Sequence, residues 1–237
     1  MDSRYSEIRK TTLDVFSTYS PIEGSEITSI SPTGSYKLRI LTYGPDQKPA
    51  WYYSRGIVTR NSDGYVIADV IRNYGHFWYN WLEHPNGNEY LLCGEDYQGY
   101  CVVNLSQESY QVYFPEEGYH GTGFCWTAVY PSPDNLVLAV HGCIWASPYD
   151  LVFYDFRTPD NLPYRELGRT SDVLDTYRWL DNQTFQIEQE ITLRKEDRVL
   201  YNDLSEVEQD KIDRGETEAE YQTIKVQITK PALDPPI

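Results

Sequence analysis

Short apolar runs separated by turns recur along most of the chain. Four stretches share one order: an apolar or aromatic segment, a turn rich in proline, asparagine, aspartate or glycine, and a second apolar segment. These stretches are residues 27–38, 81–92, 126–138 and 179–187. Proline presets φ at the first turn position, while glycine, asparagine and aspartate tolerate the left-handed backbone conformation. The pattern therefore predicts an all-β chain built from antiparallel hairpins.

Each of the first three hairpins is followed by two more apolar segments, which gives four strands per repeat. The added segments are residues 51–59 and 65–70, 100–105 and 111–114, and 150–156 and 164–167. The second, third and fourth hairpins each begin with a tryptophan. These residues, Trp81, Trp126 and Trp179, are separated by 45 and 53 residues. Four short strands at this spacing are the period of a β-propeller blade. We therefore expect about four antiparallel four-stranded blades.

Several short motifs occur at equivalent places in these units. They are the turns SPTG, HPNG and PSPDN, the Gly75-His76 pair, and Tyr154-Asp155 at the end of a third strand. With these motifs the chain resembles WD-repeat and related PD-type β-propellers over residues 26–228, although it contains no Trp-Asp dipeptide. The resemblance implies a small propeller or a propeller-like arc. An open arc completed by a partner and a large antiparallel sandwich remain alternatives.

The fourth unit departs from this pattern. Residues 194–220 contain ten acidic and five basic residues, and they precede a regularly alternating segment at residues 221–229. Within them four apolar residues have near-helical spacing: Leu200, Leu204, Val207 and Ile212. We expect a short amphipathic helix or a mobile insertion that ends near Gly215.

A single propeller-like domain is expected over residues 26–229. The 237 residues of the chain are enough for one large domain with a substantial core. Residues 1–25 are expected to be an N-terminal segment that is able to close a blade. Residues 230–237 contain three prolines and are expected to be a disordered tail.

The charge of the chain narrows the classes of partner. A formal net charge of −16 repels phosphate groups, so we expect neither nucleic acid nor an anionic membrane surface as a partner. No apolar run approaches the roughly 20 residues that span a bilayer. Residues 1–10 are charged and lack the apolar segment of a secretory signal, which predicts a cytoplasmic protein. The expected partner is a basic or polar protein or peptide.

The four cysteines form two pairs about turns. Cys93 and Cys101 flank one turn, and Cys125 and Cys143 flank another, so each pair is placed to face across a hairpin. The chain contains no CxxC motif, which disfavours a zinc site. We interpret the cysteines as reduced, small buried hydrophobic residues and expect neither a metal nor another cofactor.

In a propeller, the loops that enter a blade and the loops between its second and third strands share one face, and such loops commonly carry function. Applied to this chain, that face collects nine candidate binding residues. They are Tyr74, His76, Glu95, Asp96, Tyr97, Tyr119, His120, His141 and Trp145. Residues 194–220 are expected to project from the same face, whereas His84 belongs to the opposite one.

Two interpretations apply to His76 and His120. In the first, which the Gly-His motif of WD repeats implies, each histidine forms a hydrogen bond inside its own blade, to Asn104 and Asp155 respectively. In the second, the imidazoles and nearby carboxylates line a central mouth and bind a metal or a polar ligand. The sequence separation of 28 and 35 residues favours the structural interpretation.

Catalytic motifs are not evident in the sequence. Glu95 and Asp96 are neighbours in one turn, which does not establish the separation and unequal pKa values that acid–base catalysis requires. Phosphate-binding glycine loops, a nucleophile elbow and an HExxH motif are missing. We therefore expect a non-catalytic module that binds a protein or peptide. The alternatives are an enzyme that acts on a sugar or another polar small molecule at the central mouth, and a structural arc that another chain closes.

Overall fold

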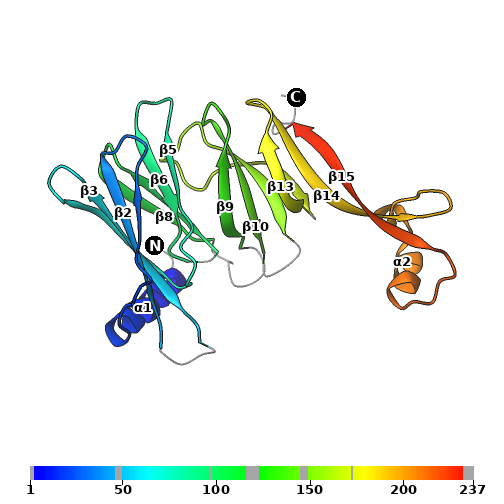
Figure 1. The fold of residues 1–237 in the computed structure, drawn as a ribbon, viewed down its shortest axis with the longest axis horizontal. Helices are drawn as coiled ribbons and strands as arrows, with labels where there is room; N and C mark the ends of the chain where they lie inside the picture. The colour runs from blue at the N-terminus through cyan, green and yellow to red at the C-terminus, as the bar shows by residue number, and fades with distance from the viewer. Residues whose placement is uncertain are drawn as a thin grey trace.

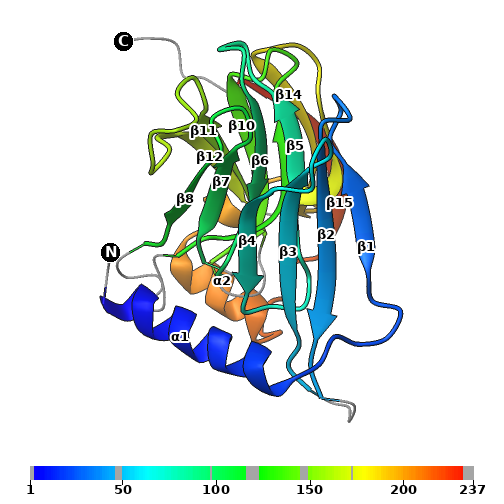
Figure 2. The same cartoon turned by 90° about the vertical axis from the view of Figure 1, so that its left-hand side faces the viewer.

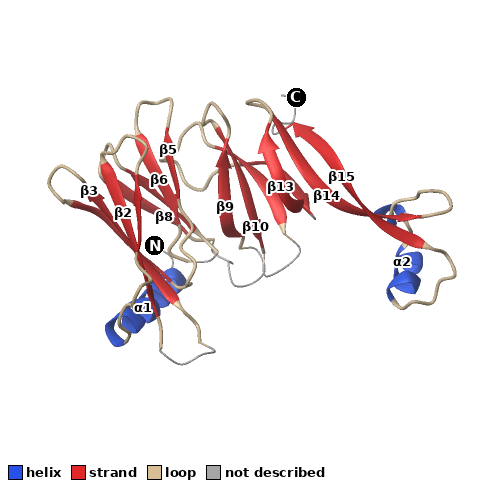
Figure 3. Cartoon of the chain, viewed as in Figure 1, coloured by secondary structure: helices blue, strands red, loops and turns tan. Residues whose placement is uncertain are grey.

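A computed structural model describes residues 3–45, 50–96, 98–115, 123–144, 149–171 and 173–231 of the chain. Within these ranges the chain forms fifteen β-strands and two α-helices, so the all-β prediction is confirmed (Figure 3). The strands make four antiparallel sheets, which we call A to D in chain order.

Each sheet is a meander in which sequence neighbours are also hydrogen-bonded neighbours. Sheet A contains β1 (Ile27–Ile30), β2 (Tyr36–Tyr43), β3 (Tyr53–Arg60) and β4 (Val66–Arg72). Sheet B contains β5 (Asn80–Glu83), β6 (Glu89–Cys93), β7 (Tyr100–Asn104) and β8 (Ser109–Tyr113). Sheet C contains β9 (Cys125–Pro131), β10 (Val137–Cys143), β11 (Asp150–Asp155) and β12 (Glu166–Ser171). Sheet D contains β13 (Val173–Trp179), β14 (Thr184–Arg194) and β15 (Tyr221–Pro231), one strand fewer than expected.

The sheets pack face to face in the order A, B, C, D, with a separate hydrophobic core at each interface (Figure 1). Sheets B and C are therefore buried on both faces. In β6, Tyr90 and Leu92 belong to the core shared with sheet C, while Leu91 and Cys93 belong to the core shared with sheet A. Alternate residues of a strand point to opposite faces, so a strand between two cores is mostly apolar on both faces. This explains the uninterrupted apolar runs of the middle sheets.

The repeated tryptophans connect successive sheets, and two of them, Trp81 and Trp179, do so between first strands. The indole Nε1 of Trp81 in sheet B donates to Ser29 Oγ of β1 at 2.9 Å. In the same way Trp179 Nε1 in sheet D donates to the carbonyl oxygen of Tyr130 in β9 at 2.9 Å. Trp126 in sheet C stacks on the ring of Tyr100 in sheet B, with 4.3 Å between ring centroids. The spacing of tryptophans in the sequence thus reports contacts between sheets.

The two outermost sheets lie at opposite ends of the molecule, so the described strands do not close into a ring (Figure 1). The outer face of sheet D is polar. Thr223, Lys225 and Gln227 of β15 are exposed on it, and Lys225 Nζ lies 3.7 Å from Glu188 Oε1 of β14. The outer face of sheet A is instead covered at one end by a helix.

This helix is the part of the fold that the sequence prediction missed. Part of the N-terminal segment, for which the sequence suggested only that it is able to close a blade, forms α1 (Ser3–Thr18), which lies across one end of sheet A (Figure 2). Tyr5, Ile8, Thr12 and Phe16 recur at helical spacing. Tyr5 and Thr12 are buried, and the Phe16 ring contacts Tyr43 of β2 with 4.6 Å between centroids.

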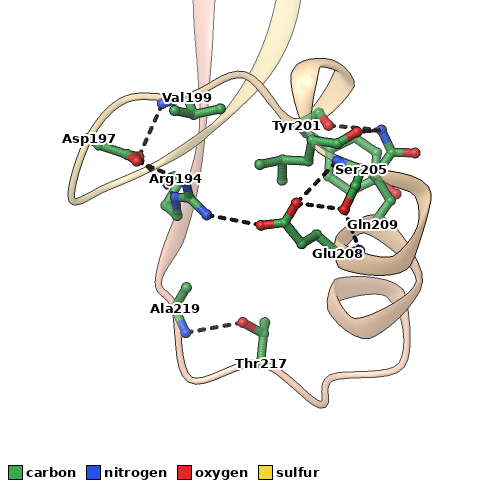
Figure 4. Close-up of polar contacts among 10 residues, drawn as sticks. Arg194, Asp197, Val199, Tyr201, Ser205, Glu208, Gln209, Thr217 and Ala219 are labelled. Carbon is green, nitrogen blue, oxygen red and sulfur yellow. Dashed lines mark hydrogen bonds and ion pairs between the residues drawn. The ribbon is translucent and has the colours of Figure 1, made fainter.

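The insertion in the fourth unit contains a short helix. Of the two alternatives expected from the sequence, a short helix and a mobile insertion, the structure shows the first. β14 and β15 form a long hairpin whose end carries a short 3-10 turn, η2 (Tyr201–Asp203), and α2 (Glu206–Asp213). A capping box begins α2, since the Glu208 backbone N–H donates to Ser205 Oγ and the Ser205 N–H donates to the Glu208 carboxylate (Figure 4). Arg194 forms ion pairs with Asp197 at 2.8 Å and Glu208 at 3.6 Å. No residue of α2 is buried, so these polar contacts hold the end of the hairpin.

The expected placement of the cysteines across two hairpins and their burial are confirmed. Cys93 lies opposite Cys101 in the β6–β7 ladder, and Cys125 lies opposite Cys143 in the β9–β10 ladder. None of the four forms a disulfide in the described structure, and all four are buried. Burial is the main cause that raises the pKa of Cys101, and it raises the pKa of Cys125 to about 12.

We expect the folded protein to resist thiol alkylation, because reagent must wait for local opening to reach a buried thiol whose thiolate is disfavoured. Iodoacetamide labelling followed by mass spectrometry would measure this. All four thiols should react promptly in concentrated guanidinium chloride, with little modification of the native protein over the same time. Prompt labelling of any native cysteine would contradict the packing described for that thiol.

Candidate functional site

One end of the sheets gathers the connections that sequence analysis singled out. In an antiparallel meander, alternate connections lie at the same end. The β2–β3, β4–β5, β6–β7 and β10–β11 connections therefore share one end, which we call the loop face. Helix α1 lies against this end (Figure 2). Five of the nine candidate residues are described, and the structure places all five there: Tyr74, His76, Glu95, Asp96 and His141. Tyr97, Tyr119, His120 and Trp145 lie outside the described residues.

Glu95 is buried under α1 and anchors it. Only 5% of this residue is exposed. Its Oε2 accepts a hydrogen bond from the Tyr5 hydroxyl and lies 3.4 Å from Arg9 Nε, while its Oε1 accepts from the Tyr110 hydroxyl. Burial and then the Glu95 charge raise the pKa of Tyr5, which keeps the phenol protonated as a donor. A carboxylate from sheet B thus attaches the N-terminal helix to the loop face.

Asp96 and Arg72 form the second half of this buried polar cluster. Asp96 is 3% exposed, and its carboxylate accepts hydrogen bonds from the Gln98 backbone N–H at 2.8 Å and from the Asn73 side-chain amide. Arg72, at the end of β4, is 2% exposed. Its Nη1 donates to the carbonyl oxygens of Gly94 and Asp96 at 2.9 and 3.0 Å. Burial lowers the Arg72 pKa, and the nearby Asp96 opposes that change. Arg72 therefore ties sheet A to the β6–β7 loop of sheet B.

The four oxygens of Glu95 and Asp96 all accept hydrogen bonds from protein donors. Buried carboxylates that are satisfied in this way contribute to the placement of their donors. Both residues come from a single loop of sheet B, so they do not form a pair that converges from different sheets. Within the described part of the chain, no three His, Cys, Asp or Glu side chains are grouped so that they could hold a metal ion.

The proposed hydrogen bond between His76 and Asn104 is wrong. Asn104 Nδ2 donates to the Tyr90 hydroxyl and to Asp160, at the end of sheet B that is opposite the loop face. The hydrogen bond shown for His76 is made by its backbone, whose carbonyl oxygen accepts from Arg72 Nε at 2.8 Å. Asp155, the expected partner of His120, forms ion pairs with Arg157 and Arg165.

His141 is a buried member of sheet C. Its Nδ1 lies 3.1 Å from Thr127 Oγ1, and its ring stacks on Tyr149 with 4.8 Å between centroids and an interplanar angle of 15°. The imidazole therefore supports an aromatic ring that is itself 37% exposed.

Exposed aromatic side chains are the feature of the loop face that sequence analysis undervalued. Trp51 is 53% exposed and Tyr74 is 43% exposed, and their ring centroids lie 5.3 Å apart. Trp51 Nε1 donates to the carbonyl oxygen of Asn73 at 2.7 Å, which fixes the indole beside the β4–β5 loop. Tyr149 immediately precedes β11 and so lies in the β10–β11 connection of the same loop face. We call Trp51, Tyr74 and Tyr149 the aromatic strip. The sequence did contain a sign that Trp51 has a different role: unlike Trp81, Trp126 and Trp179, it does not begin one of the repeated hairpins.

A groove of about 390 Å³ separates α1 from these loops. We call it the α1 groove. It is lined by Glu7, Ile8, Thr11, Thr12, Trp51, Tyr53 and Asn73. One wall is therefore helical and largely polar, and the other is aromatic.

Two comparisons with known proteins bear on this chain. No family model matches it. A protein of Acanthamoeba polyphaga mimivirus, named "Uncharacterized protein R762", is 32% identical over 210 residues, which cover 84% of this chain and 82% of the relative. In addition, none of the helices in the described ranges has the length and apolar character needed to cross a membrane.

We expect Glu95→Gln to lower the free energy of unfolding by about 2 kcal/mol, because hydrogen bonds to a buried charge are lost or weakened. Amide hydrogen exchange should also accelerate in α1 more than in sheets B and C. The matched control is Glu196→Gln, which removes the same charge from an exposed site and should change stability by less than about 0.5 kcal/mol. Unchanged exchange in α1 would show that Glu95 does not anchor the helix.

The pH dependence of stability should contain a contribution from His76. Partial burial and then Arg72 lower the His76 pKa below its ordinary value of 6.5, so the folded protein binds this proton less tightly than the unfolded chain. The contribution is present above pH 6.5 and is lost as pH falls through the lowered folded-state pKa. Chemical denaturation of His76→Gln at several pH values should show a shallower loss of stability on acidification. An identical pH profile for variant and wild type would exclude this contribution.

Proposed function

The chain belongs to the same family as mimivirus protein R762, and we propose that it is a non-catalytic interaction module that binds a protein or peptide partner on its loop face. The observation that carries this proposal is the aromatic strip. Trp51, Tyr74 and Tyr149 are exposed on a face whose buried carboxylates, Glu95 and Asp96, accept hydrogen bonds from protein donors. Tryptophan and tyrosine are the side chains most enriched at the energetic centres of protein interfaces.

The strip is also well prepared for binding. The Nε1 hydrogen bond of Trp51 and the stack of Tyr149 on His141 fix two of the three rings before a partner arrives. Side chains that are already ordered lose little conformational entropy on association. The net charge of −16 favours the approach of a basic partner through long-range electrostatic attraction.

We further propose that the four sheets are blades of an open, WD-repeat-like propeller arc. Successive sheets pack face to face, and their first strands are joined by side-chain hydrogen bonds. Asn80 Nδ2 adds another such contact, to the carbonyl oxygen of Val129, at 3.1 Å. These contacts suit a fan that is narrowest at its first strands. Cysteines that form no disulfide are usual in reducing compartments, which supports a cytoplasmic setting.

The enzyme alternative is less well supported. Proton transfer to a substrate requires a group within hydrogen-bond reach of it. Glu95 and Asp96 are buried, and protein donors occupy their oxygens. The geometry of the loop face therefore favours recognition over catalysis.

Site-specific photocrosslinking tests the proposed face. A benzophenone side chain at Tyr74 should crosslink a discrete partner in cell extract, whereas the same group at Tyr65 should not. Tyr65 is a matched control because it is 53% exposed and lies in the β3–β4 turn, at the opposite end of sheet A.

Replacing Trp51 with alanine in the Tyr74 crosslinking protein should remove the crosslink, with the melting temperature nearly unchanged because the side chain is exposed. Equal crosslinking from positions 74 and 65, or a crosslink that survives the loss of Trp51, would reject the loop face as the binding surface.

A further inference from the structure

We propose that the α1 groove binds a lysine or arginine side chain of the partner. This inference rests on the proposed function and specifies the chemistry of its contact beside the aromatic strip. It follows from three properties of the groove: a fixed aromatic wall, a carboxylate on the facing helix, and polar groups that act as acceptors.

Trp51 and Tyr53 form the aromatic wall. Because Trp51 Nε1 is already bonded to the Asn73 carbonyl oxygen, the indole offers its ring rather than its donor to the groove. The face of an aromatic ring carries partial negative charge and attracts cations, and tryptophan does so most strongly. A cationic side chain in the groove is therefore complementary to this wall.

The helical wall supplies negative charge and hydrogen-bond acceptors. Glu7 is exposed, and no described cation forms an ion pair with its carboxylate. Thr11 Oγ1 and Thr12 Oγ1 donate to the carbonyl oxygens of Glu7 and Ile8 at 3.1 and 3.0 Å. With their protons committed, these hydroxyl oxygens are left as acceptors. Ammonium and guanidinium groups are donors without an acceptor, so they match this wall.

Competing cations do not line the groove among the described residues. Of the basic residues of α1 near these positions, Arg9 lies 3.4 Å from Glu95, and neither Arg9 nor the exposed Lys10 lines the groove. The volume of about 390 Å³ lies in the lower part of the range typical of ligand sites, roughly 300–1,000 Å³. That room suits one long side chain with part of its backbone.

Peptide titrations test this directly. The probes are acetylated six-residue peptides in which glycine alternates with lysine, arginine, norleucine or glutamate. The reporter is the indole N–H NMR signal of Trp51, assigned with Trp51→Phe. Lysine and arginine peptides should shift this signal in a saturable way, and norleucine and glutamate peptides should not.

Matched variants separate local recognition from attraction to the whole acidic protein. Glu7→Gln should weaken binding of the lysine peptide about tenfold, the effect of 1.4 kcal/mol. Glu196→Gln removes the same charge from the distant end of the β14–β15 hairpin and should change the Kd less than twofold. Tyr65→Leu serves as a control for the loss of an exposed aromatic ring. Circular dichroism melting confirms that each variant is folded.

The inference is overturned if the norleucine peptide binds as tightly as the lysine peptide, or if Glu7→Gln and Glu196→Gln weaken lysine-peptide binding equally. It is also overturned if light scattering shows that the groove is occupied by a second copy of this chain and that the peptides merely displace that copy. The failures remain distinguishable from those of the proposed function. If Glu7→Gln leaves the Tyr74 crosslink intact and cationic peptides do not bind, the loop face still binds a partner without this contact. If cationic peptides bind but no Tyr74 crosslink forms, the groove is a cation site and the proposed function fails.

Discussion

The burial of sheets B and C on both faces is the constraint on which the rest of the structure depends. A four-stranded sheet that is apolar on both sides is unstable alone, and each middle sheet needs a neighbour on either side. Leu91 and Tyr90 are adjacent in sequence yet belong to different cores. Stability is thus shared along the row of sheets, and the loss of an outer sheet would expose the core beneath it.

This packing determines where polar groups and function are placed. The inward-facing positions of the strands are occupied by core residues, so the buried charges Arg72, Glu95 and Asp96 lie where the strands end. Arg72, Glu95 and Asp96 are buried there, and hydrogen bonds offset the cost of removing them from water. These groups attach α1 and the loops firmly, which leaves Trp51 and Tyr74 on a rigid support. Glu95 and Asp96, the carboxylates that the sequence singled out, are occupied by protein donors, whereas the rings of Trp51 and Tyr74 remain exposed.

Local patterns in the sequence predicted the repeating part of the fold. Turn residues marked the hairpins, and tryptophan spacing marked the contacts between sheets, because both are set by short-range or periodic constraints. Helix α1 was missed because its docking depends on Glu95, which is 90 residues away from Tyr5. The hydrogen bond expected between His76 and Asn104 was wrong because residue spacing does not show at which end of a strand a side chain lies. The placement of Tyr74, His76, Glu95, Asp96 and His141 at one end followed from strand order, but the burial of the carboxylates did not.

The polar outer face of sheet D and the helix on the outer face of sheet A have a joint consequence for assembly. A row of sheets with apolar outer surfaces would add further copies at either end and grow into a fibre. Here Lys225 and its polar neighbours make the outer face of sheet D polar, and α1 covers part of the outer face of sheet A. These two outer faces resemble the capping units that keep repeat arrays finite. The row of described sheets thus stops at faces that do not favour the addition of another sheet, without closing into a circle.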